Sequence, residues 1–296
     1  MVSKSCHALL HTLVDYAGLF PPAGLSMQSA VGNYAEYRRS SYAWMLGRFV
    51  VPVARLDEFA SARSSILAPS DDPHWRVSAL VGDDAAGDAT HIEAFNADGR
   101  GIWVDAVEVK APTPDAIRRV AGAVPRTIKV YVEVPVADDP HALIAAIAEN
   151  KVRAKIRTGG VTPDAFPSVE QVGRFLLECY ATNVAFKATA GLHHPLRSTR
   201  ALTYEANGPR RVMHGFLNVF LAAAFHYNGL THRDADALLN MTSLDGVEFA
   251  DDALVWKDYR VSLAELSTVR RRFAVSFGSC SFREPVDDLI QLGLLS

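Results

Sequence analysis

The sequence predicts an α/β protein in which a single (β/α)8 barrel uses the whole chain, residues 1–296. Eight short apolar runs have the length and composition of β-strands. Most of these runs are separated by segments with the apolar spacing of helices, an alternation typical of a parallel sheet. The chain length suits one large barrel, and no glycine-rich nucleotide-binding motif follows a strand. These observations favour the barrel over an open doubly wound sheet.

The elements alternate regularly for the first two thirds of the chain. Ser26 is a residue type that caps helices, and it stands at the start of the first long helical pattern. A turn is expected at 83–87. The predicted helices are 26–39, 56–67, 91–96, 113–123, 140–149 and 169–179. The predicted strands are 13–20, 44–51, 75–81, 102–110, 127–134, 153–158, 184–189 and 273–277.

Residues 195–270 are long for one connection, so we interpret them as an insertion between the seventh and eighth strands. Helical patterns lie at 211–227 and 232–240, and a hairpin is expected from 247–249 with 254–259. Two placements remain open for this segment. It covers the mouth of the barrel as a lid, or it packs on the outside or against a second subunit.

Composition excludes several classes of protein. The formal net charge of −3 provides no basic field for nucleic acid, and no apolar run reaches the roughly 20 residues of a membrane span. Cys6, Cys179 and Cys280 are odd in number and far apart, which argues against a disulfide framework. We therefore expect a cytoplasmic protein with no signal peptide, no cofactor and a small-molecule substrate. The apolar helix 216–225 offers a surface for a homodimer.

Charged side chains alternate with apolar ones in the predicted strands five to seven. Lys129 and Glu133 share one face of strand five, Lys155 and Arg157 share one face of strand six, and Lys187 shares a face of strand seven with Thr189. The valine-rich faces must pack on the helices. The charged faces therefore point into the barrel, where a lysine costs several kcal/mol unless it is paired or solvated.

Strand four is ambiguous in the same respect. Glu108 and Lys110 share one face and Asp105 lies on the other, so only a bulge would turn both sets inward. The alternative to a reactive site is a buried ion-pair network that only stabilises the barrel. Charges in such barrels usually gather at the catalytic end, which favours a site.

The positive charges gathered in the predicted lumen indicate that one lysine reacts as an uncharged amine. Cations around Lys155, namely Arg157 and Lys187, favour its uncharged amine, and a neutral amine attacks a carbonyl to form a Schiff base. The iminium then stabilises a carbanion at the adjacent carbon, as a class I aldolase requires. Asp105 or Glu133 would relay protons through water.

The order of six segments resembles deoxyribose-phosphate aldolase, a class I aldolase family with a TIM-barrel fold. The resemblance implies that Lys155 is the Schiff-base lysine, Lys187 the second lysine that activates it, and Asp105 the acid of the proton relay. The segments are VDAV (Val104–Val107), IKVYVE (Ile128–Glu133), AKIRTGG (Ala154–Gly160), PSVEQV (Pro167–Val172), VAFKATAG (Val184–Gly191) and SFGSCS (Ser276–Ser281).

The departures from that family bear on the substrate. Arg157 replaces a small residue, and His193–His194 stand where the phosphate-binding segment of the family continues. Arg157 and His193 would instead hold a carboxylate. We therefore expect a small aldehyde or keto acid as substrate. The expected substrate-binding residues are Arg157, Glu108, Lys110, Thr189, His193, His194, Gly278 and Ser279, with the backbone amides of Gly278–Ser281 as an anion cradle.

Other functions remain open. His193 and His194 with Glu108 and Glu133 would suit a divalent metal, which implies a metal-dependent lyase or isomerase at the same barrel mouth. A non-catalytic barrel that binds a small molecule is the other alternative. Cys280 follows a glycine at a strand end, a place suited to a nucleophile, but the sequence identifies no general base beside it.

Overall fold

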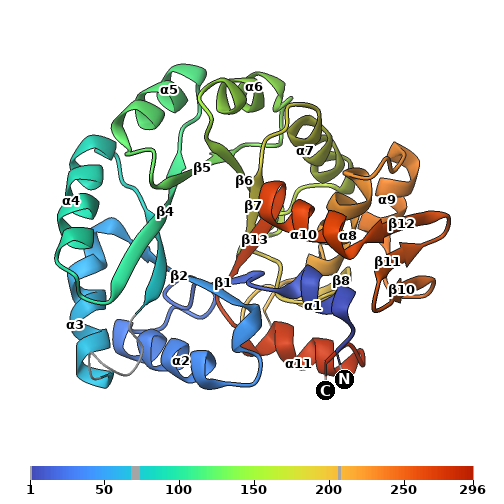
Figure 1. Ribbon diagram of the computed structural model, residues 1–296, viewed down its shortest axis with the longest axis horizontal. Helices are drawn as coiled ribbons and strands as arrows, with labels where there is room; N and C mark the ends of the chain where they lie inside the picture. Colours follow the sequence, from blue (N-terminus) through green and yellow to red (C-terminus); the bar gives the residue numbers. More distant parts are fainter. Residues whose placement is uncertain (1, 68–73, 206–207, 296) are drawn as a thin grey trace.

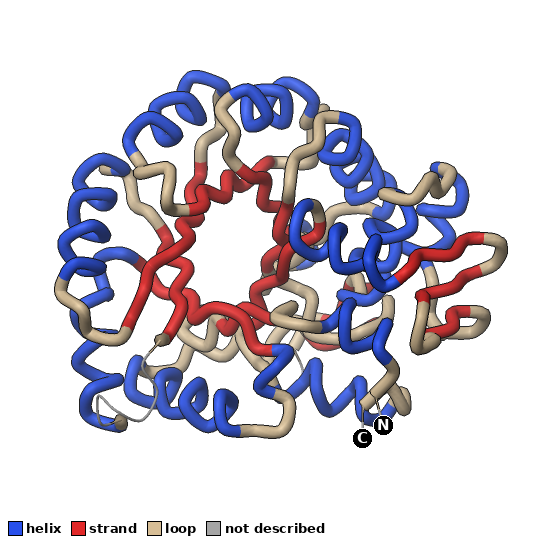
Figure 2. The backbone as a smooth tube through the Cα atoms, viewed as in Figure 1, coloured by secondary structure: helices blue, strands red, loops and turns tan. Residues whose placement is uncertain are grey.

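The computed structural model describes residues 2–67, 74–205 and 208–295 and confirms the (β/α)8 barrel. Within these residues eight parallel strands close into a ring in the order β1-β13-β7-β6-β5-β4-β3-β2 (Figure 2). Each strand overlaps one of the eight predicted runs. The strands are β1 (Val14–Tyr16), β2 (Leu46–Pro52), β3 (Trp75–Leu80), β4 (Ile102–Lys110), β5 (Lys129–Val134), β6 (Arg153–Arg157), β7 (Phe186–Thr189) and β13 (Ala274–Ser279).

Helices surround this ring on its outside (Figure 1). As expected, the Ser26 side chain caps the first long helix by accepting from the backbone N–H of Ser29. Asp84 accepts from Gly87 N–H and begins a helix, so the turn expected at 83–87 is wrong. Helices α1 (Lys4–Leu10), α10 (Leu263–Arg272) and α11 (Arg283–Gln291) were not predicted. The others of the ring are α2 (Met27–Arg39), α3 (Leu56–Ile66), α4 (Ala85–Ala97), α5 (Pro114–Ala123), α6 (His141–Glu149), α7 (Val169–Ala181) and α8 (Phe216–His226).

The long connection between β7 and β13 contains several elements, which pack in different places. The antiparallel pair β8 (Ser198–Ala201) and β9 (Arg210–Met213) comes first, so the predicted helix starts at Phe216 rather than at 211. Helix α9 (His232–Asn240) packs on α7 and α8. The expected hairpin is a three-stranded sheet of β10 (Val247–Phe249), β11 (Ala253–Trp256) and β12 (Tyr259–Ser262), which lies outside the ring (Figure 1).

Helix α8 is enclosed by its own chain. Every residue from Phe216 to His226 is buried, and the helix contacts α7, α9, α10, β12 and β13. Its apolar composition therefore reflects burial within the monomer. The expectation that helix 216–225 offers a surface for a homodimer is wrong, because this helix has no exposed face within the monomer.

A bulge in β4 resolves the ambiguity of strand four. Val77 of β3 pairs with Val104 and Ser78 pairs with Ala106, so Asp105 is an extra residue in the ladder. The inserted residue shifts the alternation of side chains by one position. Asp105 and Glu108 consequently both point into the lumen, and they are only 8% and 3% exposed.

No helix in the described ranges is both long enough and apolar enough to cross a membrane.

Candidate active site

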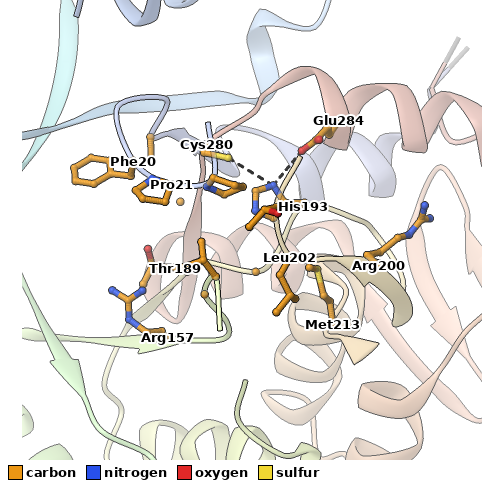
Figure 3. Close-up of a pocket in the computed structure, with 18 of the residues that line it drawn as sticks. Phe20, Pro21, Arg157, Thr189, His193, Arg200, Leu202, Met213, Cys280 and Glu284 are labelled. Carbon is orange, nitrogen blue, oxygen red and sulfur yellow. Dashed lines mark hydrogen bonds and ion pairs between the residues drawn. The ribbon is translucent and has the colours of Figure 1, made fainter. Parts of the chain in front are cut away.

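A cavity of about 550 Å³ opens at the C-terminal ends of the barrel strands. Figure 3 shows Arg157 and Thr189 on one side of it, with His193 and Cys280 on another. Of the residues predicted from sequence, those that line it are Glu108, Lys155, Arg157, Thr189, His193, His194 and Gly278. Lys187, Asp105, Glu133, Lys110 and Ser279 are not among the lining residues. The cavity occupies the end of the barrel where enzymes of this fold place their active sites.

Two glycine turns permit the close approach of β6 and β7 at this end. A Cβ atom on Gly159 would lie 2.8 Å from the Cα of Gly191, and Gly191 has a φ of +75°. Larger residues would force these turns apart. The glycines that follow both lysine-bearing strands thus bring the strand ends, and the lysines before them, together.

Lys155 lies between two carboxylates. Its Nζ donates to Glu108 Oε2 at 3.0 Å and pairs with Glu133 Oε2 at 2.8 Å, and the residue is 4% exposed. Burial alone would raise the pKa of Glu133, but Lys155 and then Arg157 outweigh burial and lower it. Lys155 is therefore the lysine that combines contact with the cavity and direct contact with proton acceptors.

Lys187 lies deeper, beside Lys155. The two residues are register partners in β6 and β7, and Lys187 is 1% exposed. Its Nζ donates to Glu108 Oε1 at 2.6 Å and to Asp15 Oδ2 at 2.7 Å. Burial lowers the pKa of Lys187, but Asp15 and Glu108 outweigh burial and raise it well above its usual range. Lys187 is thus held as a cation out of reach of the cavity.

Acidic and basic groups alternate in the lumen, so the expected crowding of cations around Lys155 is wrong. Glu108 stands between the two lysines, and both lower its pKa well below the usual range although burial opposes this. Asp15 was visible in sequence as an acid inside an apolar run. Its pairing with Lys187 was not, because the two residues are 172 positions apart.

Asp105 belongs to a separate cluster. Its carboxylate accepts from Arg48 and Arg76, at 2.5 and 2.6 Å, and from Lys129 at 3.2 Å. Arg76 and Lys129 stand at the starts of β3 and β5, which places this cluster at the N-terminal end of the barrel. Burial would raise the pKa of Asp105, but Arg48 and Arg76 lower it well below the usual range. The acid implied by the family resemblance therefore faces the end opposite the cavity.

A pair of arginines borders the cavity from β8 and β9. Arg200 and Arg210 line it together with Arg157, whose Nε donates to Glu133 Oε1 at 3.2 Å. Part of the long connection thus borders the cavity as a rim, and the sheet β10–β12 lies outside the ring (Figure 1). That this segment acts as a lid stays a prediction.

Cys280 has a base beside it that sequence reasoning missed. Its Sγ is 3.9 Å from Nδ1 of His193, and the same nitrogen is 3.1 Å from Glu284 Oε2 (Figure 3). Tyr204 lies 3.9 Å from the sulfur and donates to Glu284 Oε1 at 3.2 Å. Glu284 is on α11, a helix absent from the prediction, and no motif links these positions.

The two histidines turn to different acids. His194 Nδ1 is 2.6 Å from Asp288 Oδ2, whereas His193 faces Glu284. Within residues 2–67, 74–205 and 208–295, no three His, Cys, Asp or Glu side chains are arranged to hold a metal ion. The pair therefore does not form the ligand set considered with Glu108 and Glu133.

Comparison with known proteins adds only a distant fold likeness. No family model matches the sequence, and no curated protein does. Among solved structures, the spore cortex-lytic enzyme SleL of Bacillus cereus is similar with a TM-score of 0.39 and 9% identity, over 95% of this chain and 74% of that one.

Proposed function

We propose that the protein is a lyase of the class I aldolase type, in which Lys155 forms a Schiff base with a small aldehyde or keto acid. The observation that carries the proposal is the position of Lys155. It borders a cavity of about 550 Å³ and contacts two carboxylates, whereas Lys187 is closed off beneath it. The ordered segments that resemble deoxyribose-phosphate aldolase support the same assignment.

The first chemical requirement is removal of a proton from Lys155. Glu133 accepts from the lysine at 2.8 Å, and at 14% side-chain exposure it is nearer to solvent than Glu108 at 3%. Glu133 is therefore the group best placed to take the proton. The free amine then attacks the carbonyl carbon. The carbonyl oxygen takes one proton from the nitrogen and one back from Glu133, and it leaves as water to give the protonated imine.

Glu108 and Lys187 would act through Lys155. Glu108 accepts from both lysines, and Lys187 is anchored by Asp15. A fixed ammonium group beside the iminium disfavours a second positive charge, which promotes electron flow from the substrate onto the iminium nitrogen and so favours the neutral enamine. In this arrangement the relay uses Glu133 and Glu108, and Asp105 has a structural part at the other end of the barrel.

The charge of the rim indicates an acidic substrate. Arg157, Arg200 and Arg210 line the cavity, and guanidinium groups bind carboxylate or phosphate through paired hydrogen bonds. The side chain of Arg157 is 45% exposed, so it is accessible to a ligand. Small keto acids and aldehydes that carry an acidic group fit this combination of lysine and arginine.

Reduction of the Schiff base tests the proposal. Incubation with a panel of small aldehydes and keto acids, followed by borohydride, should add the mass of the reduced substrate to the peptide that contains Lys155. Lys155→Arg keeps a cation against Glu108 and Glu133 but forms no imine, and it should lose both the adduct and turnover. Lys129→Arg is the matched control, because Lys129 is also a lumen lysine paired with a carboxylate.

Adducts confined to other lysines, or full activity in Lys155→Arg, would contradict the assignment. Saturable binding of the panel compounds without any adduct would indicate a binding barrel without catalysis. Activity that requires an added metal ion and survives Lys155→Arg would indicate the metal-dependent alternative.

A further inference from the structure

A second group of reactive side chains borders the same cavity. It consists of Cys280, His193, Glu284 and Tyr204. They lie, respectively, directly after β13, in the segment after β7, on helix α11 and in the segment between β8 and β9. All of them line the cavity. The mechanism proposed for Lys155 uses none of these residues, so the group requires its own explanation.

The environment of Cys280 differs from that of the other two cysteines. Burial raises the pKa of the Cys6 thiol to about 12 and that of Cys179 well above its usual value. Neither of them lines the cavity, whereas Cys280 does. A thiol that borders a cavity beside an imidazole has the surroundings of a reactive cysteine, and buried thiols without such a partner are inert.

His193 is built to carry a positive charge next to this sulfur. Burial lowers the pKa of His193, but its contacts with Cys280 and Glu284 outweigh burial and raise the pKa to about 10. Glu284 is 3.1 Å from His193 and also accepts from Tyr204, which fixes the carboxylate. The neighbouring His194 is paired with Asp288 and takes no part.

We propose that Cys280 and His193 form a second covalent centre, at which the sulfur adds to the carbonyl carbon of a small aldehyde. In the reactive pair the proton of the Cys280 thiol already lies on His193, so the sulfur is a thiolate beside an imidazolium, and this thiolate forms the carbon–sulfur bond. The electron pair of the carbonyl double bond moves to oxygen, which takes the proton back from His193. The product is a thiohemiacetal, and reversal of the same steps releases the aldehyde unchanged.

The shape of the cavity supports an aldehyde as the ligand. The sulfur stands at the wall of a cavity of about 550 Å³ whose apolar neighbours include Phe20, Leu202 and Met213. A cavity of this size and lining suits a small carbonyl compound. The inference does not depend on Schiff-base formation at Lys155, because the two centres give chemically different adducts.

Selective alkylation tests the reactivity of the thiol. Treatment of the folded wild-type protein with iodoacetamide at about pH 6.5, followed by peptide mass analysis, should label Cys280 and leave Cys6 and Cys179 unlabelled. The labelling rate of Cys280 should stay high where an ordinary thiol, with a pKa of about 8.5, is mostly protonated. His193→Gln should reduce the rate about tenfold or more, and Tyr204→Phe, which keeps His193, should reduce it less.

A rate that increases only through about pH 8.5 in the wild-type protein would overturn the proposal. This measurement needs no variant, so it remains decisive if His193→Gln does not fold.

Direct detection of the adduct tests the ligand class. Propanal labelled with carbon-13 at its carbonyl should give a thiohemiacetal signal with the wild-type protein and none with Cys280→Ser. Propanal should also protect Cys280 from iodoacetamide in a saturable manner. Borohydride reduction of the same sample reports imines at lysine and not the thiohemiacetal. A reduced imine on Lys155 without the thiohemiacetal signal would reject the Cys280 proposal and leave the Schiff-base proposal standing. A thiohemiacetal signal without any imine on Lys155 would reject the Schiff-base proposal and leave the Cys280 proposal standing.

Discussion

Glu108 controls the charge of the lumen at the scale of single residues. Its two oxygens accept from Lys155 and Lys187, and its Oε1 also accepts from Ser78. A buried carboxylate in this position raises the pKa of Lys187. Under the proposed mechanism, the proton leaves Lys155 against the attraction of Glu108.

Replacement of Glu108 by glutamine should move Schiff-base trapping toward lower pH. The amide has nearly the shape of the carboxylate but no charge, so the ammonium form of Lys155 loses one stabilising neighbour. Trapping yield with a reactive keto acid, measured against pH, gives the profile for both proteins. Glu149→Gln on the surface of α6 is the control for a lost charge elsewhere, and its profile should match the wild type. An unchanged profile in Glu108→Gln would contradict the coupling.

At the scale of elements, the local sequence pattern predicted the positions of the barrel strands but not the bulge in β4. Each barrel strand is an apolar run whose position depends on its own residues, so all of them could be predicted. The bulge at Asp105 arises from the pairing of β4 with β3, which no local pattern contains. Strands β8 and β9 were interpreted as helix or loop, because their exposed residues carry no apolar alternation.

The rim formed by β8 and β9 should determine the preference for acidic substrates. Arg200→Gln and Arg210→Gln each remove a cation that borders the cavity. A hydrogen bond to a charged group contributes about 1.5–3 kcal/mol, so KM for a keto acid should rise roughly 10- to 100-fold. KM for a neutral aldehyde should change little.

Arg211→Gln provides a matched control for the rim, because Arg211 is exposed on the same strand and does not line the cavity. Equal effects of all three substitutions on the acid would indicate general electrostatics rather than contact with the substrate.

At the scale of the whole molecule, closure of the ring creates the site. Asp15 and Lys187 meet because β1 pairs with β13 and β13 with β7, and His193 meets Cys280 across 87 residues. Strand alternation in the sequence identified both lysines and the cavity residues Arg157 and Thr189. It could not identify the base of Cys280 or the acids that neutralise the lysines, since these contacts depend on which strands are neighbours in the closed barrel.

The same interleaved charges should make the folded protein sensitive to acid. The pKa values of Asp105, Glu108 and Glu133 are lower in the folded chain than the ordinary 3.8 and 4.5 of Asp and Glu. Above about pH 6 all three are ionised in both states, and their full stabilisation is present. As the pH falls below this value, the unfolded chain takes up protons that the folded chain does not, so the free energy of unfolding decreases.

Urea unfolding measured between about pH 3 and pH 7 should therefore show a plateau above about pH 6 and a decline below it. Glu108→Gln should be less stable on the plateau, because Lys155 and Lys187 each lose an ionised partner, and its decline toward acid should be shallower by the contribution of one carboxylate. The difference between the two proteins should thus narrow as the pH falls. A constant difference across this range would mean that folding does not lower the pKa of Glu108, and the charge of Glu108 would then not hold the lysines in place.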